Sequence, residues 1–367
     1  MILTMDDKTI TIAIDSFKGC MTSHEANLAA AEGVRQAAPN LNVESFDVSD
    51  GGEGFLEAMR PDEIVPCHVH DAMMRWTDSA FGIKDGKAII EVAKAVGLAM
   101  IEPEKRNAFA ATSYGVGELI VHAMEKGCRE FVIGLGGSAT SDCGLGMLRC
   151  LKHEWQVKEN KSWYDIFDTS WLHRFKVTLA TDVSNPLLGY NGAAHVFAPQ
   201  KGADAEMVKK IERRARTFAQ AAAKHLGKDM SDMAGAGAAG GLGYAFMEFM
   251  DARTESGAEL VMRSSGLDKA IASSQMVITG EGSADGQTLM GKLPSVVLTH
   301  GKASNVPVAL MTGKYSDKEK LMEAGFSTII NINDGQPSNE DPLKKEIAAK
   351  RLTLATRHYI SATFVQN

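Results

Sequence analysis

The chain has 367 residues, 44% of them hydrophobic and 23% charged, which is typical of a globular protein with two domains. Its formal net charge of -7 argues against nucleic acid as a partner, because nucleic-acid-binding proteins usually carry a basic surface. The five cysteines form no CxxC pair, no apolar run is long enough to span a bilayer, and Asp6 and Asp7 stand where a secretion signal would be basic. We therefore expect a reduced, cytoplasmic protein without a membrane partner.

The chain opens with a β-α-β pattern. Residues 9–14 predict a strand, and a capping box at Thr22 and Glu25 begins a helix that Pro39 ends. Residues 42–48 predict a second strand. This order favours a parallel sheet, because neighbouring strands joined through a helix run in the same direction.

The middle of the chain repeats the alternation of strands and helices. Strands are predicted at 88–92, 131–133 and 177–180, and helices at 115–124, 207–226 and 242–250. Residues 152–176 are polar and aromatic, and we interpret them as a surface excursion. The basic side chains at 209–216 are interpreted as a solvated helix face.

Two buried strands are predicted near the C-terminus, at 275–279 and 306–311, and each ends in a polar glycine turn like those of the opening units. The pattern predicts an α/β protein with a discontinuous first domain. Residues 1–70 and 273–367 would form a Rossmann- or flavodoxin-like parallel-sheet domain, interrupted by a second, inserted α/β domain at 71–272.

The segment from Gly134 to Asp142 brings glycines and hydroxyls from a strand to the start of a helix. Free N–H groups and the positive helix end suit a phosphate, although glycines that pack a strand against a helix would give the same pattern. Four more polar turns follow predicted strands, at 15–19, 49–54, 182–186 and 280–285, and each carries a carboxylate. Ligands of open α/β sheets bind at such strand ends, and carboxylates beside a phosphate would hold Mg²⁺ or accept a proton.

Two further glycine patterns are misleading. Residues 235–240 match GxGxxG but follow no strand, so we interpret them as a close approach of two backbones. Residues 286–292 match most of a P-loop, but Leu293 replaces the Ser or Thr that would bind Mg²⁺. A true P-loop is therefore not predicted, although Lys292 remains a candidate for contact with phosphate.

Taken together, the motifs resemble those of the bacterial-type glycerate kinases, in the family's order and over nearly the whole chain. The matching stretches include Asp15-Ser-Phe-Lys-Gly19, Asp50-Gly-Gly-Glu-Gly54 and Gly136-Gly-Ser-Ala-Thr140, and continue at 112–120, 182–187, 192–194, 197–203, 235–241, 280–282 and 287–292. The resemblance implies two α/β domains, one inserted in the other, with the active site in the cleft. It also implies phosphorylation of D-glycerate from ATP with Mg²⁺, most often on the 2-hydroxyl. The partners would be these small molecules, and a homodimer is left open.

On this hypothesis Asp182 orients and deprotonates the substrate hydroxyl, with Asp50 as second choice, and Lys18 neutralises developing phosphate charge. Asp50 and Asp182 are also the predicted Mg²⁺ ligands. The predicted phosphate- and nucleotide-binding residues are Gly136, Gly137, Ser138, Thr140, Glu281, Asp285 and Lys292. The predicted substrate-binding residues are Ser16, Arg106, Asn185 and Lys201.

The chain departs from the family pattern at several of these motifs. Ser283 stands where the family has Arg, Ser141-Asp-Cys143-Gly144 replaces Asn-Asp-Gly-Gly, and Asp71-Ala-Met-Met replaces a Gly-Pro-Leu-Gly turn. A missing guanidinium would weaken phosphate or carboxylate binding. Three alternatives therefore stay open: the 3-phosphate as product, a related small hydroxy acid as substrate, or a non-catalytic homologue that binds nucleotide or glycerate.

Overall fold

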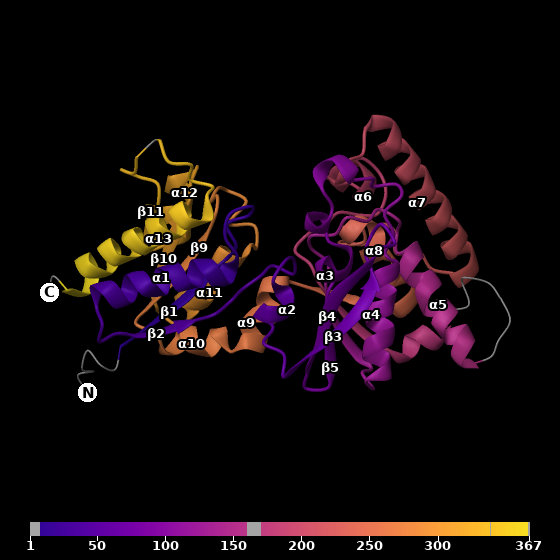
Figure 1. Ribbon diagram of the computed structural model, residues 1–367, viewed down its shortest axis with the longest axis horizontal. Helices are drawn as coiled ribbons and strands as arrows, with labels where there is room; N and C mark the ends of the chain where they lie inside the picture. Colours follow the sequence, from indigo (N-terminus) through magenta and orange to yellow (C-terminus); the bar gives the residue numbers. More distant parts are fainter. Residues whose placement is uncertain (1–7, 160–169, 338, 366–367) are drawn as a thin grey trace. The chain divides into compact units, whose positions relative to one another are not determined.

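The computed structural model describes residues 8–159, 170–337 and 339–365 (Figure 1). The chain forms two compact α/β units, and the first is discontinuous. It contains the chain up to Asp50, residues 57–59 and the chain from Ala258 onward, whereas the second contains Gly51–Leu56 and Arg60–Gly257. An α/β fold with one domain inserted into another is confirmed.

The expected domain boundaries, near residues 70 and 273, differ from these. Glu63–His70 forms β3, which pairs antiparallel with β4 (Trp76–Lys84) in the second unit. At the other end, most of α9 (Gly257–Ser265) and all of α10 (Leu267–Ser273) belong to the first unit. β3 joins the second unit through its hairpin with β4, which in turn pairs with β5, whereas α10 packs against β1 and α11 of the first unit.

The first unit contains a fully parallel sheet in the order β11-β10-β9-β1-β2. Its strands are β1 (Thr9–Ile14), β2 (Asn42–Ser45), β9 (Met276–Glu281), β10 (Val308–Thr312) and β11 (Thr328–Asn331). The four predicted strands of this unit are confirmed, although β2 ends at Ser45 rather than at residue 48. Their carboxyl ends lead into the polar turns at 15–19, 280–285 and 312–314.

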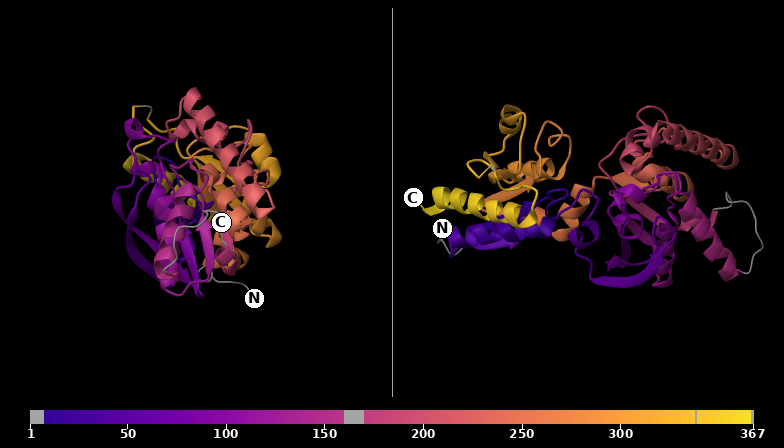
Figure 2. Two further views of the ribbon diagram at one scale, coloured as in Figure 1. Left: turned by 90° about the vertical axis from the view of Figure 1, so that its right-hand side faces the viewer. Right: turned by 45° about the horizontal axis from the view of Figure 1, so that its top comes forward.

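Helices cover both faces of this sheet. Ile10, Ile12 and Ile14 alternate along β1 and pack in one cluster with α1 (Ser23–Ala37) and α13 (Lys345–Ile360), which run side by side (Figure 2). On the opposite face, Thr11 of β1 hydrogen-bonds Ser274, which follows α10. The remaining helices of this unit are α11 (Leu293–Ala303) and α12 (Lys318–Ala324). The predicted capping box is confirmed, since Thr22 and Glu25 cap α1 reciprocally.

The second unit contains a mixed sheet in the order β3-β4-β5-β6-β7-β8. Its strands β5 (Lys87–Glu91), β6 (Glu130–Gly134), β7 (Lys176–Ala180) and β8 (Arg253–Glu255) are parallel, whereas β3 and β4 form an antiparallel hairpin. The predicted strands at 88–92, 131–133 and 177–180 are confirmed as β5, β6 and β7. The helices are α3 (Ala93–Val96), α4 (Tyr114–Glu125), α5 (Leu145–Glu159), α6 (Ala193–Phe197), α7 (Ala205–Leu226) and α8 (Ala238–Met250), and the short α2 (Phe55–Ala58) spans the unit boundary.

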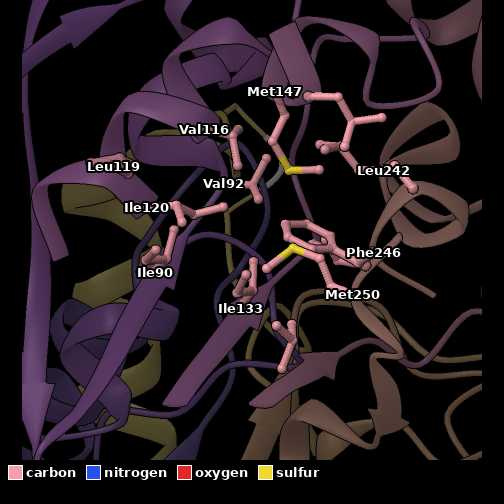
Figure 3. Packing of buried hydrophobic residues seen from close by; sticks show 14 of the residues in the cluster. Ile90, Val92, Val116, Leu119, Ile120, Ile133, Met147, Leu242, Phe246 and Met250 are labelled. Carbon is pink, nitrogen blue, oxygen red and sulfur yellow. The ribbon is translucent and has the colours of Figure 1, made fainter. Parts of the chain in front are cut away.

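The core of the second unit lies between the sheet and helices α4, α5 and α8. Figure 3 shows Ile90 and Ile133 of the sheet facing Ile120 of α4, Met147 of α5 and Phe246 of α8. Of the predicted surface excursion at 152–176, residues 152–159 continue α5 instead, and 160–169 lie outside the described residues. Within the described ranges, no helix is both long and apolar enough to cross a membrane.

Candidate functional site

The loop from Gly136 to Asp142, called here the 136–142 loop, connects β6 to α5. Its last residue caps the helix: the Asp142 carboxylate accepts from the N–H groups of Gly144 (3.1 Å) and Gly146 (3.0 Å). The same carboxylate accepts from the N–H (2.8 Å) and the hydroxyl (3.0 Å) of Ser113. The N-terminus of α5 therefore already binds an anion from the chain itself, and the expectation that this helix end is open to a phosphate is wrong.

The first part of the 136–142 loop remains available. Gly136 is partly exposed and Gly137 is exposed, and Gly137 has a left-handed φ of 72°. Among the described residues, no acceptor lies within hydrogen-bond distance of the N–H groups of Gly137 and Ser138. Thr140 is fully buried and its hydroxyl donates to Ala239 O at 3.4 Å. Of the predicted cradle, the N–H groups of Gly137 and Ser138 thus remain for an anion, whereas Gly136 N–H already donates to Gly51 O at 2.9 Å.

Lys201 lies beneath this loop. Only 3% of its surface is exposed, and its Nζ donates to Ser138 Oγ at 3.1 Å and to Thr140 O at 2.7 Å. Burial lowers the pKa of Lys201 to about 7, and the negative charge of Asp142 opposes that fall. The predicted substrate-binding Lys201 therefore contacts the loop itself.

Arg214 of α7 is a second cation on the loop. Its guanidinium donates to Ser141 O and Phe109 O, both at 2.9 Å, and lies 4.3 Å from the centre of the Phe109 ring. The interpretation of the basic run on α7 as a solvated face is wrong for this residue. No local signal separates Arg214 from its exposed neighbour Arg213, because only the packing of α7 turns it toward the loop.

The glycines at 235–241 bring two backbones together, which confirms the interpretation made from the sequence. No strand precedes them, and a Cβ on Gly240 would overlap the carbonyl oxygen of Thr140. Gly240 has a left-handed φ of 67°, and its carbonyl accepts from Cys143 N–H at 3.0 Å. This segment therefore supports the 136–142 loop and is no dinucleotide site.

Asp182 lies on the same edge of the sheet as the 136–142 loop. It follows β7, which pairs with β6, and Leu135 N–H donates to Ala180 O at 3.2 Å. The Asp182 side chain is exposed. Asn185, in the same turn, has a structural role. Its side-chain amide donates to Asn191 O at 2.7 Å, and its backbone carbonyl accepts from Gly237 N–H at 2.8 Å.

Arg106 is the remaining predicted substrate-binding residue of the second unit. Its backbone carbonyl lies against Gly202, next to Lys201, and its Nε donates to Ile101 O at 3.3 Å. Arg106 therefore lies close to the backbone of the residue that follows Lys201.

In the first unit, Ser16, Lys18 and Asp50 surround Asp15 at the carboxyl end of β1. Burial raises the pKa of the Asp15 carboxyl to about 7, and the negative charge of Asp50 adds to the rise. The Ser16 N–H, which donates to Asp15 Oδ1 at 2.7 Å, and the charge of Lys18 oppose it. From the sequence, Asp15 is one of the carboxylates at strand ends, with no individual role assigned to it. Its position directly after β1, one residue before Ser16, was the available signal.

Three predicted phosphate- and nucleotide-binding residues lie close together at the carboxyl end of β9: Glu281, Asp285 and Lys292. The Thr288 hydroxyl donates to Glu281 Oε1 at 2.5 Å and accepts from Asp285 N–H at 3.0 Å. Lys292 Nζ lies 3.6 Å from Glu281 Oε2. Burial raises the pKa of Glu281, and the Thr288 hydroxyl and the Lys292 charge oppose the rise. Lys292 precedes the first residue of α11, so the P-loop arrangement, in which the lysine lies on the helix, is not formed.

No metal centre is preformed in the described part of the chain, where no three His, Cys, Asp or Glu side chains are gathered closely enough to hold an ion. The predicted Mg²⁺ ligands Asp50 and Asp182 belong to different units. Within the first unit, the negative charges of Asp50 and Glu281 both act on the Asp15 carboxyl.

Comparison with known proteins identifies the family. A model described as the glycerate kinase family matches residues 10–363. The chain belongs to the glycerate kinase family. A glycerate 2-kinase of Escherichia coli K12 is 38% identical over 346 residues, which cover 88% of this chain and 91% of that protein. A glycerate kinase of Haemophilus influenzae is 37% identical over 340 residues, which cover 88% of this chain and 90% of that protein.

A solved structure supports the same assignment. The crystal structure of a Salmonella typhimurium LT2 protein, provisionally assigned as glycerate kinase 2, matches with a TM-score of 0.77 and 32% identity. The match covers 98% of this chain and 99% of that one. The resemblance seen in the motifs is confirmed, and the chain is an enzyme of the glycerate kinase family.

Two of the residues that depart from the family pattern, Asp71 and Cys143, make structural contacts in this chain. The Asp71 carboxylate closes its own turn, accepting from Met73 N–H at 2.8 Å, Arg75 N–H at 2.9 Å and Arg75 Nε at 2.7 Å. Cys143 is buried with a left-handed φ of 55°, and burial raises the pKa of its thiol to about 12. Cys143 is thus a protonated core thiol rather than a nucleophile.

Proposed function

We propose that this protein transfers the γ-phosphoryl group of ATP to the 2-hydroxyl of D-glycerate. The observation that carries the proposal is the family match over residues 10–363, with relatives named glycerate kinase and, in Escherichia coli, glycerate 2-kinase. Phosphoryl transfer requires alignment and charge neutralisation more than covalent chemistry. Backbone N–H groups, lysines and carboxylates at strand ends are groups that can supply both.

The proposed roles follow the placement of the residues. The exposed Asp182, on the sheet edge that carries the 136–142 loop, orients the substrate hydroxyl and accepts its proton. The N–H groups of Gly137 and Ser138 bind phosphate oxygens, and Lys18 neutralises developing charge. Lys292 contacts nucleotide phosphate, while Ser16 and Arg106 remain candidates for holding the acceptor.

Mg²⁺ fits the carboxylates of the first unit. It prefers carboxylate oxygens and water, and Asp15 and Asp50 repel each other, as the raised pKa of Asp15 indicates. A divalent cation would relieve that repulsion. We therefore propose Asp50 as a Mg²⁺ ligand, with Asp182 as the second candidate. When bound, Mg²⁺ neutralises charge on the transferring phosphoryl group.

A coupled ADP-release assay tests the reaction. With ATP, Mg²⁺ and D-glycerate the protein should release ADP continuously, and omitting D-glycerate should stop the release. A kinase for a related small hydroxy acid is the second candidate, favoured by Ser283 in place of the family's Arg. A panel with glycolate, D-lactate and D-glycerate separates the two by kcat/KM. Measurable ATP binding without turnover on any of them would instead indicate a non-catalytic binding protein.

The role of Asp182 can be tested by Asp182→Asn. Loss of the base should lower kcat by about 10²–10⁴-fold, the usual contribution of general base catalysis. Because the side chain is exposed, Asp182→Asn should keep the fold, which circular dichroism checks. Asp232→Asn, which changes another exposed carboxylate of the same unit, serves as the control and should retain turnover. Near-normal turnover in Asp182→Asn would remove Asp182 from this role.

A further inference from the structure

Lys201 is buried yet touches the part of the 136–142 loop that we assign to phosphate. Its Nζ has two acceptors, Ser138 Oγ and Thr140 O, and only 3% of the residue is exposed. Ser138 itself is 5% exposed and adjoins Gly137, whose N–H has no acceptor among the described residues. Lys201 can therefore act on a bound anion through Ser138.

The direction of the hydrogen bond between Lys201 and Ser138 depends on the charge of the lysine. An ammonium group has three donors and no acceptor, so a charged Lys201 obliges Ser138 Oγ to accept. The hydroxyl hydrogen of Ser138 is then directed elsewhere and is available to a ligand. A neutral amine has a lone pair, and Ser138 can donate its hydrogen to that lone pair instead.

We propose that Lys201 is a positioning residue whose proton makes the Ser138 hydroxyl a donor to an anion bound at the 136–142 loop. Loss of that proton reverses the hydrogen bond and withdraws the donor. The inference rests on the proposed function, because that function assigns phosphate to the 136–142 loop. It adds that the protonation of Lys201 controls how tightly the loop binds an anion.

The charges around Lys201 decide the pH range of this effect. Burial lowers its pKa to about 7, and Asp142, at the end of the same loop, opposes the fall. The other charged groups of neighbouring elements are Arg214 of α7, at Ser141 O, and Arg106, whose carbonyl lies against Gly202. A bound anion adds negative charge near the ammonium and must raise its pKa. Anion binding above pH 7 should therefore be coupled to proton uptake by Lys201.

Sulfate is a suitable probe, because it is a tetrahedral dianion that does not titrate between pH 6 and pH 9. Its binding can be followed at the backbone amide signals of Gly137 and Ser138 in ¹H–¹⁵N spectra of the full-length protein. Below pH 7 the dissociation constant should be constant. Above pH 7 it should rise, by up to tenfold per pH unit, as the neutral form of Lys201 becomes dominant.

Variants of Lys201 separate its charge from its bulk. Lys201→Arg stays charged and should remove the pH dependence, whereas Lys201→Met should bind sulfate weakly at every pH. Lys210→Met, which removes an exposed lysine of α7, should behave like the wild type. Wild-type affinity that is flat up to pH 9, or Lys201→Met with the wild-type profile, would overturn the proposal.

A second measurement needs no variant and stays decisive if the Lys201 variants do not fold. The ¹³Cε signal of Lys201 in the wild type should titrate, and saturating sulfate should move its midpoint to higher pH. An unmoved midpoint would contradict the proposal. Neither readout depends on turnover: failure to release ADP overturns the proposed function alone, whereas pH-independent sulfate binding by an active enzyme overturns only the role of Lys201.

Discussion

Asp142, Lys201 and Arg214 all direct their charge at the 136–142 loop and its surroundings. Each is hydrogen-bonded to backbone groups, which offsets the cost of burying these charges. The 136–142 loop and Lys201 could be predicted from the sequence, because both lie in recognisable motifs. The hydrogen bonds of Asp142 to Ser113 and of Arg214 to Ser141 O could not be predicted, since each joins residues that are distant in the chain.

The raised pKa of Asp15 should make the free energy of unfolding depend on pH. The Asp15 pKa in the folded protein, about 7, lies above the ordinary value of 3.8, so the folded protein binds this proton more tightly than the unfolded chain. Stability from this group is present at low pH and is lost as pH rises toward 7. Asp15→Asn cannot ionise and should be more stable than the wild type at pH 8 by a few kcal/mol at most, because one pKa unit is about 1.4 kcal/mol. At pH 4 the difference should vanish.

Thermal unfolding of both proteins between pH 4 and pH 8 measures this difference. Asp232→Asn, at an exposed position, should follow the wild type throughout. If Asp15→Asn gained no stability relative to the wild type between pH 4 and pH 8, a destabilised carboxylate at Asp15 would be ruled out.

At the scale of elements, the predictions that depended on local signals are confirmed. The capping box of α1, the stop at Pro39 and the buried strands β1, β9 and β10 arise from short-range chemistry and hydrophobic pattern. The start of α8 is different. Ala239, Gly240 and Gly241 have left-handed φ values, which the GxGxxG pattern permits but does not reveal. They are needed because Thr140 and Cys143 approach that backbone closely.

The close approach at Gly240 can be tested by Gly240→Ala. An alanine there is strained by its left-handed φ of 67° and also overlaps the Thr140 carbonyl. The strain costs about 1–2 kcal/mol and overpacking about 1–3 kcal/mol more, so a loss of roughly 3 kcal/mol in unfolding free energy is expected. Chemical denaturation monitored by circular dichroism measures it.

Gly227→Ala is the matched control. Gly227 ends α7 with a left-handed φ of 71°, but no atom lies within 4 Å of the position that a Cβ would take. Only the backbone strain applies, so the loss should be about 1–2 kcal/mol. Equal losses in the two variants would mean that the contact between Gly240 and Thr140 contributes nothing.

At the scale of the whole molecule, the alternation of strands and helices predicted two α/β domains and the return of the chain to the first. Both sheets place polar turns at the carboxyl ends of parallel strands, as the pattern indicated. The boundaries were harder to predict, since the hairpin of β3 and β4 joins the second sheet only through β5. The substrate came from the family resemblance, because no residue pattern by itself distinguishes glycerate from other small acceptors.

The central claim is transfer of a phosphoryl group from ATP to the 2-hydroxyl of D-glycerate. The most direct test is ³¹P and ¹³C NMR of the product formed by the wild-type protein from ATP, Mg²⁺ and ¹³C-labelled D-glycerate. Transfer to the 2-hydroxyl gives a phosphomonoester whose phosphorus couples to C2 and to the hydrogen on that carbon. A product with phosphorus coupled through the C3 methylene, or no phosphoglycerate at all, would contradict it.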